Sequence, residues 1–187
     1  MNSASLSQRQ VGIEGEHVFL RTLLPDDASE RYASWLNDPV VNQYLETRSM
    51  TIPKLRAYIG EKWESDQALL LGVFWKETGL PAGQAGAHIG NVKLEPVDLS
   101  GRMAMLGLLI GDKEFWGRGV GTEATNLATN FAFKDLGIRE MRLGVIAQNT
   151  PAIRVYEKCG FTVDHIEKNG INHDGVLHDK IHMIKKA

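Results

Sequence analysis

The sequence lacks the features that mark several classes of protein. Its 187 residues include one cysteine, Cys159, so no disulfide can form within the chain. The longest apolar run, residues 103–110, is far shorter than the roughly 20 residues that a membrane-spanning helix needs. The formal net charge is only -2, whereas broad nucleic-acid binding requires a basic surface. We therefore expect a cytoplasmic protein that binds neither membranes nor nucleic acid.

A metal-binding set of residues is also missing from the sequence pattern. His178 and His182 are four residues apart, which would place them on one face of a helix, but their surroundings predict a strand. No cysteine or carboxylate pair completes a tetrahedral set, so we expect no bound metal.

The composition is that of an ordinary folded domain. Hydrophobic residues make up 43% and charged residues 24% of the chain, which argues against disorder. This length suits one domain. Residues 1–10 are polar and are predicted to form a flexible N-terminal tail. The predicted single domain therefore spans residues 11–187.

The hydrophobic pattern alternates between strands and helices. Short connections predict antiparallel pairing of the first strands, and a strand–helix–strand unit follows. Asp27 and Glu30 have the spacing of a capping box, and Thr51 is predicted to cap a second helix. The prediction is a mixed α/β (α+β) fold with a mostly antiparallel central sheet and helices on both faces. The pattern gives about seven strands (17–23, 68–75, 86–94, 102–110, 141–147, 161–167 and 176–185) and about four helices (28–37, 51–66, 119–136 and 150–158).

A glycine-rich turn lies between the fourth predicted strand and the third predicted helix. Gly117, Gly119 and Gly121 alternate with Arg118 and Val120. Glycines allow positive φ and the close approach of a ligand, and the free amides and dipole of the next helix favour an anion. Phosphate is the expected guest, while a turn required only for packing is the plainer alternative.

Two familiar phosphate-binding loops do not match this turn. A P-loop needs Lys before Ser or Thr, whereas Thr122 directly follows Gly121. A dinucleotide-binding loop has its third glycine one residue later and follows the first strand.

The turn instead resembles the acyl-CoA loop of the Gcn5-related N-acetyltransferases (GNAT). Trp116 stands at the position of that motif's leading Gln or Arg. Residues 115–124 resemble the branch of ribosomal-protein N-terminal (RimJ/RimL-like) and amino-sugar acetyltransferases, where an aromatic residue at this position is common. Residues 149–161 resemble the family's second motif, Asn-x-x-Ala-x-x-x-Tyr-x-x-x-Gly-Phe.

The resemblance covers about residues 17–187 and implies a GNAT fold in which the fourth and fifth predicted strands splay apart. Acetyl-CoA would be the acetyl donor, with its pantetheine arm in the gap like an added strand. A backbone amide of the fourth strand would stabilise the developing oxyanion, and the glycine-rich turn would hold the pyrophosphate. The residues implied in donor binding are Leu108, Leu109, Ile110, Arg118, Gly119, Val120, Gly121, Thr122, Asn149, Ala152 and Tyr156.

Tyr156 is the implied general acid, which would protonate the departing CoA thiolate. Without the motif, it would be interpreted as an aromatic residue on the inner face of a short helix. The usual base is absent, because Met105 stands near the position where several relatives of this branch carry Glu. Backbone carbonyls and water are one substitute. Other candidate bases, each with a structural or solvated alternative, are Glu46, His88, Asp112 and Asp179.

The acceptor is expected over the first two predicted helices. Residues 35–48 resemble the corresponding loop of relatives that acetylate amino sugars or protein N-termini, and a solvated connector is an equal alternative. Glu46 would suit a cationic amine and Arg48 an anionic group. The candidate acceptor-binding residues are Tyr44, Glu46, Arg48 and His88.

The resemblance therefore implies an N-acetyltransferase that moves an acetyl group from acetyl-CoA to a primary amine by direct transfer in a ternary complex. A small metabolite such as an amino sugar is the first acceptor hypothesis, and a protein N-terminus is the second. A non-catalytic acyl-CoA-binding module is a different class, which Met105 favours and Tyr156 disfavours. Dimers are common among similar proteins, so a homodimer is also expected.

Overall fold

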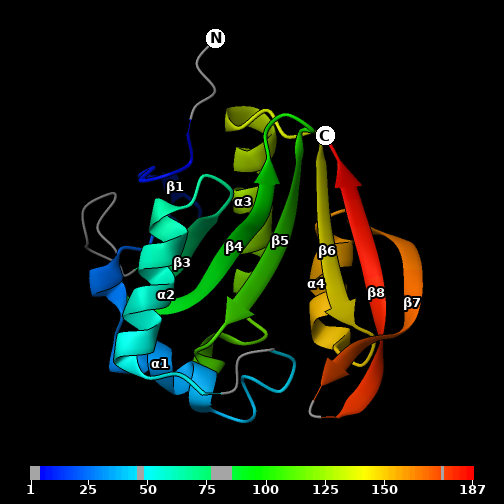
Figure 1. Cartoon of the computed structure of the whole chain (residues 1–187), viewed down its shortest axis with the longest axis horizontal. Helices are drawn as coiled ribbons and strands as arrows, with labels where there is room; N and C mark the ends of the chain where they lie inside the picture. The colour runs from blue at the N-terminus through cyan, green and yellow to red at the C-terminus, as the bar shows by residue number, and fades with distance from the viewer. Residues whose placement is uncertain (1–4, 46–48, 77–85, 174) are drawn as a thin grey trace.

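The computed structural model describes residues 5–45, 49–76, 86–173 and 175–187. Eight strands form one sheet in the order β1-β2-β3-β4-β5-β6-β8-β7 (Figure 1), and only the β5–β6 pair is parallel. This mixed, mostly antiparallel sheet confirms the predicted fold class. The strands are β1 (Gly12–Glu14), β2 (Val18–Thr22), β3 (Leu69–Trp75), β4 (His88–Asp98), β5 (Met103–Ile110), β6 (Glu140–Ile146), β7 (Thr162–His173) and β8 (Val176–Lys186).

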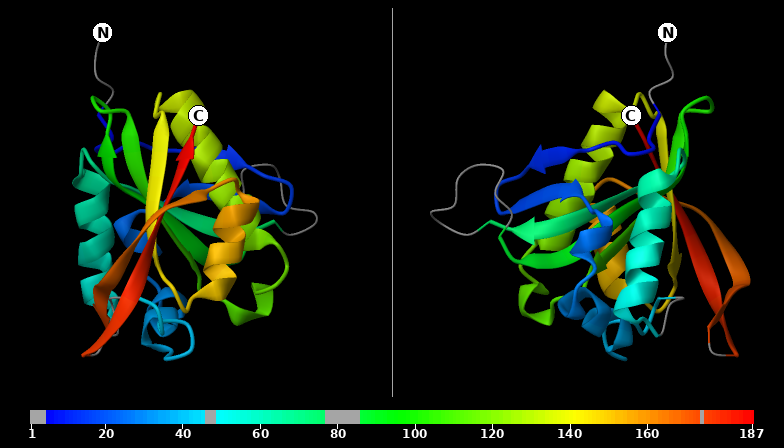
Figure 2. Two further views of the ribbon diagram at one scale, coloured as in Figure 1. Left: turned by 90° about the vertical axis from the view of Figure 1, so that its right-hand side faces the viewer. Right: turned by 60° about the vertical axis from the view of Figure 1, so that its left-hand side comes forward.

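Helices cover both faces of the sheet, as predicted. Figure 2 shows α1 (Glu30–Asn37) and α2 (Ile52–Glu64) on one face, and α3 (Val120–Asp135) and α4 (Thr150–Lys158) on the other. Each face has its own apolar core, because successive side chains of a strand point to opposite faces. No helix among the described residues is long and apolar enough to cross a bilayer.

Three strands differ from their predicted extents. β1 is an additional short strand, β4 continues past residue 94 to Asp98 through an irregularity in its register, and β7 runs to His173 instead of ending near residue 167. β7 lies at the edge of the sheet, and most of its described side chains are exposed. Its pairing with β8 therefore defines it more than its hydrophobic pattern does.

The N-terminal segment is packed where a loose tail was expected. Leu6 is only 2% exposed and belongs to the core that faces α3. The backbone N–H of Gln8 donates to the carbonyl of Trp63 at the end of α2, at 2.7 Å. Residues 5–10 thus contribute to the folded structure, and the core extends to Leu6.

The start of α1 corrects the predicted capping box. The Ser29 hydroxyl accepts the N–H of Tyr32 at 3.2 Å and is the cap of the helix. Asp27 lies in a preceding 3-10 turn, η1 (Pro25–Asp27), where its carboxylate accepts from Leu24 and pairs with Arg21. The local sequence offers two side chains suited to capping, Asp27 and Ser29. Because Asp27 belongs to the η1 turn, Ser29 caps the helix. Thr51 caps α2 as predicted.

This cap can be tested by two substitutions. Ser29→Ala should lower the free energy of unfolding by about 1 kcal/mol, because the Tyr32 amide loses its acceptor. Glu30→Gln should cost less, because that side chain is exposed and is not part of the cap. Urea denaturation of both variants measures the difference. A larger loss for Glu30→Gln would restore the capping-box interpretation.

The predicted splay lies between β5 and β6. Residues 103–105 of β5 pair with residues 140–142 of β6, and no further residue of the two strands is paired across this boundary. Each strand continues against its other neighbour, β4 or β8. A gap therefore opens at Leu106 and Leu143 and widens toward the carboxyl ends of both strands (Figure 1).

Candidate active site

The β5 edge of the gap carries unpaired backbone groups at alternate residues. Gly111 donates its N–H to the carbonyl of Ile89, just beyond β5, at 2.9 Å. Because hydrogen bonding alternates along an antiparallel pair, Leu109 also directs its backbone groups to β4. Leu108 and Ile110 direct theirs away from β4 and into the gap, where the Ile110 carbonyl accepts a hydrogen bond from the Trp116 side chain. Of the three residues predicted to meet the donor through the backbone, two therefore face the gap.

The β6 edge lies opposite the β5 edge, and its backbone groups also point alternately toward the gap and toward the neighbouring strand. Ala147 donates its N–H to the carbonyl of Asp179 in β8 at 2.9 Å. By register, Gly144 and Ile146 then direct their backbone groups toward β5. The gap is therefore bounded on both sides by strand edges, a setting in which an extended ligand can form strand-like hydrogen bonds.

Trp116 fixes the end of β5. Its indole N–H donates to the carbonyl of Ile110 at 2.7 Å, although the side chain is 42% exposed. On the other side of this turn, a Cβ at Gly111 would stand 2.1 Å from the Trp35 ring, so only glycine permits this approach of α1. The aromatic residue at position 116 thus has a positioning role in the turn.

Two ion pairs attach the following turn, η2 (Lys113–Phe115), to α1. Asp112 caps this turn and pairs with Arg31, and Lys113 pairs with Asp38 at 2.6 Å. Exposed pairs of this kind each add little stability. Together with the contact between Gly111 and Trp35, they define where the glycine-rich turn begins.

The glycine-rich turn has the backbone conformation that an anion site requires. Gly117 and Gly119 have φ of 75° and 82°, and Gly119 caps α3 without a side-chain hydrogen bond. The bond from Glu123 N–H to the Gly119 carbonyl begins the helix, so the amides of residues 120–122 have no partner within it. Arg118 is exposed, with its guanidinium 5.4 Å from the centre of the Phe115 ring.

The acidic residue in the first turn of α3 is engaged elsewhere. The Glu123 carboxylate accepts the N–H groups of His17 and Val18 at 2.9 and 3.2 Å. It therefore anchors α3 to the start of β2. The helix dipole and the free amides at residues 120–122 remain available to an anionic ligand.

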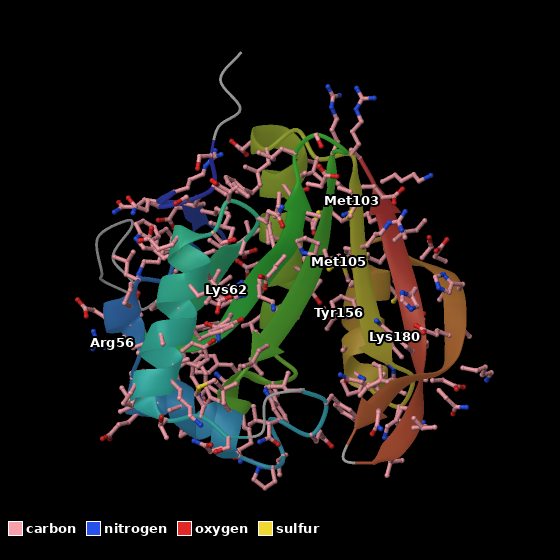
Figure 3. The ribbon with its side chains drawn as sticks, viewed as in Figure 1. Arg56, Lys62, Met103, Met105, Tyr156 and Lys180 are labelled. Carbon is pink, nitrogen blue, oxygen red and sulfur yellow. The ribbon has the colours of Figure 1, made fainter. Side chains whose placement is uncertain are left out.

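Tyr156 belongs to α4, which packs next to α3, and Figure 3 labels it beside the gap. Its side chain is 6% exposed and meets Phe161 edge to face, with ring centres 6.0 Å apart. Burial raises the pKa of the Tyr156 phenol to about 12. The hydroxyl is therefore protonated near neutral pH and can act as a hydrogen-bond donor.

The predicted residues of the second motif also organise α4. Asn149 caps the helix, and its side-chain oxygen accepts the N–H of Ala152 at 3.3 Å. The backbone amide of Ala152 is therefore already hydrogen-bonded within the protein. At the other end, burial raises the pKa of the Cys159 thiol to about 11. The thiol lies 3.4 Å from the Thr122 carbonyl, and it joins α4 to the first turn of α3.

The loop after α1 contacts the turn that follows β6, on the far side of the gap. The Tyr44 hydroxyl donates to the carbonyl of Gln148 at 3.3 Å. The Gln148 side chain lies 3.3 Å from a ring nitrogen of His178 on β8. Because Gln148 lies in the turn after β6, this contact places the Tyr44 side chain at the open end of the gap. Glu46 and Arg48, the other predicted residues of this loop, lie outside the described residues.

Residues 17–162 match the family model described as an acetyltransferase (GNAT) domain. The chain belongs to the GNAT acetyltransferase family. It is therefore an acetyl-CoA-dependent acyltransferase, as the two sequence motifs predicted.

Two relatives from Bacillus subtilis (strain 168) span nearly the same length as this GNAT chain. The probable N-acetyltransferase YjcK is 27% identical over 176 residues, covering 89% of this chain and 92% of the relative. The putative ribosomal N-acetyltransferase YdaF is 28% identical over 181 residues, with coverage of 89% and 90%.

Solved structures show the same GNAT fold. The spermidine N-acetyltransferase from Vibrio cholerae in complex with CoA and spermine has a TM-score of 0.80 at 20% identity, covering 92% of this chain and 96% of that one. The microcin C7 self-immunity acetyltransferase MccE in complex with acetyl-CoA and AMP has a TM-score of 0.78 at 19% identity, with coverage of 92% and 94%.

The candidate bases of this GNAT protein occupy different settings. Met105 is half-buried on β5 and lies opposite Arg142 in the last β5–β6 pair. Asp112 is bound to Arg31. Hydrogen bonds from Lys168 and from a backbone N–H hold the pKa of Asp179 below its usual value. These contacts favour ion-pairing roles for both aspartates.

His88 is held in an aromatic cluster beneath α1. Its ring centre lies 4.8 to 5.5 Å from those of Phe74, Trp35 and Tyr32. One ring nitrogen, Nε2, lies 2.9 Å from the carbonyl of Gly90. A carbonyl can only accept, so Nε2 carries the proton and Nδ1 is the unprotonated nitrogen. Burial lowers the pKa of this imidazole below 6.5.

The burial of His88 predicts a dependence of stability on pH. Its folded-state pKa lies below that of the unfolded chain, so acidification below about pH 6.5 protonates the unfolded state first and favours unfolding. His88→Gln retains a donor toward Gly90 but removes the titration. Between pH 7 and pH 5, the free energy of unfolding should therefore fall less in His88→Gln than in the wild type. Equal slopes in urea denaturation would contradict this assignment.

Proposed function

We propose that the protein transfers the acetyl group of acetyl-CoA directly to a primary amine of a small metabolite, within a ternary complex. One observation carries this proposal. The gap between β5 and β6 presents two facing strand edges, and the free amides at the start of α3 lie at the carboxyl end of the same strand pair. This combination suits a donor with both an extended amide-containing arm and phosphates.

Each part of the donor would use a different part of this chain. The backbone groups of Leu108 and the N–H of Ile110 would bind the pantetheine arm, because the Ile110 carbonyl already accepts from Trp116. An amide here would stabilise the negative charge that develops on the thioester oxygen. Residues 118–122 would hold the pyrophosphate. At Gly117 and Gly119 an added Cβ would meet nothing within 4 Å, which supports room for a ligand beside the turn.

Tyr156 would assist departure of the thiolate. A buried phenol with a pKa of about 12 keeps its proton at neutral pH and can donate a hydrogen bond to the leaving sulfur. The buried, protonated thiol of Cys159 does not suit an acyl-cysteine route, so it supports direct attack by the amine. With Met105 at the family's base position, the amine would lose its proton to water or a backbone carbonyl.

The acceptor would enter from the face that carries α1 and α2. The Tyr44–Gln148 contact brings the loop after α1 to the open end of the gap, which supports an acceptor held between this loop and β6. A sugar amine is the first candidate. A protein N-terminus is the second, and the name of YdaF as a putative ribosomal N-acetyltransferase favours testing it.

The first test measures donor binding and turnover together. The protein should bind acetyl-CoA in calorimetry and should release free thiol when an amine panel is added. The panel contains amino sugars, peptides with free N-termini and polyamines. Binding without turnover of any amine would favour the non-catalytic module, and failure to bind acetyl-CoA would refute the proposed function.

The second test concerns the proposed acid. Tyr156→Phe should lower kcat about 100-fold, the scale of general-acid contributions, with little change in acetyl-CoA affinity. Tyr58→Phe, on α2, is the matched control and should leave kcat unchanged. An unaffected kcat in Tyr156→Phe would remove this residue from the reaction.

A further inference from the structure

A lysine from β8 lies across β6 at the edge of the gap. Lys180 points to the face of the sheet away from α3 and α4, because the next residue, Ile181, packs toward those helices and successive side chains of a strand alternate. An added Cβ at Gly144 would stand 2.3 Å from Lys180 Cε and 3.3 Å from its Nζ. Because glycine has no side chain, the end of the Lys180 side chain occupies the space beside Gly144.

This position places the ammonium group beside the reaction gap. Gly144 is two residues beyond the last β5–β6 pair, and its own backbone groups face β5. Figure 3 labels Lys180 on one side of the gap and Met105 on the other. The lysine thus lies on the acceptor face, close to where the proposed thioester would be attacked.

The Lys180 ammonium is not neutralised by a contact with a carboxylate. Within the described part of the chain, it forms no hydrogen bond and no ion pair within 4.0 Å. Glu167, its neighbour on β7, directs its carboxylate to His182 at 2.9 Å, and that hydrogen bond, with a smaller contribution from the Lys180 charge, lowers the pKa of Glu167. Arg142, on the same face of β6, is bound to Glu140 at 2.6 Å.

We propose that Lys180 determines specificity by binding an anionic group, a carboxylate or phosphate, carried by the same molecule as the acceptor amine. This inference rests on the proposed function and narrows its acceptor class. A charge-assisted hydrogen bond to the ammonium would orient the amine toward the gap. Diamines and polyamines would be disfavoured, because the Lys180 ammonium would repel their second positive charge.

The same charge has a consequence for the amine itself. A nearby positive charge favours the neutral form of an amine over its ammonium form. Only the neutral amine can attack the thioester. Lys180 would therefore assist a reaction that lacks the family's usual carboxylate base, while its main contribution is to anchor the acceptor.

Matched probes separate the anionic group from the amine. Glucosamine and glucosamine 6-phosphate test a phosphate, and butylamine and 4-aminobutyrate test a carboxylate, with 1,4-diaminobutane as the dicationic comparison. Each probe is titrated by calorimetry into protein saturated with CoA, so that the turn at residues 117–122 is already occupied. Steady-state kcat/KM is measured with acetyl-CoA for every probe that reacts.

Three variants make the assignment specific. Lys180→Met keeps the length of the side chain without the charge, Lys180→Arg keeps the charge, and Gly144→Ala displaces the lysine while retaining it. Lys168→Met is the matched control, because that lysine is exposed on β7 and pairs with Asp179. CoA affinity is measured in all four variants to establish that the donor site is intact.

At least one probe with an anionic group should bind about 10- to 100-fold more tightly than its partner without that group, the range for a hydrogen bond to a charged group. Lys180→Met and Gly144→Ala should abolish this preference, while Lys180→Arg and Lys168→Met should retain it. Equal binding of the probes with and without an anionic group in the wild type, or an unchanged preference in Lys180→Met, overturns the inference. Failure of CoA to bind would instead contradict the proposed function. The effect of Lys180→Met on binding of the anionic probes would still decide whether Lys180 binds the anionic group.

Discussion

The separation of β5 from β6 after three residue pairs is the constraint on which the site depends. An unpaired strand edge inside a sheet is costly unless another group satisfies its backbone. Here the two edges remain apart because each strand is held on its other side, by β4 and by β8. The attachment of the η2 turn to α1 then sets where β5 ends and α3 begins.

Charge in this protein acts locally. The chain carries a formal net charge of -2, yet two positively polarised places lie along one gap. On one face are the free amides and dipole at the start of α3, with Arg118 beside them. On the other is Lys180 above Gly144. Under the proposed function, anionic groups of the substrates would be bound at particular backbone and side-chain positions, without a basic surface.

Sequence motifs predicted the parts of the site that depend on neighbouring residues. The positive φ of Gly119 and the helix that it opens follow from local patterns, whereas the cap at Asn149 is a finding of the structure. The backbone direction of Leu109 and the position of Lys180 over Gly144 depend on strand register, which joins segments far apart in the chain. The cap at Ser29 was missed because Asp27 offers an equally suitable local signal.

The gap also has a consequence for the cohesion of the sheet. Strands β1–β5 and strands β6–β8 form two blocks that share only three residue pairs at their boundary. A ligand that hydrogen-bonds to both edges acts as a missing strand and joins the blocks. Its binding energy then adds directly to folding stability, by about 2.7 kcal/mol at a concentration one hundred times its Kd. In the proposed complex the acetyl donor would be such a ligand, a removable element of the secondary structure that is present only while the enzyme is loaded.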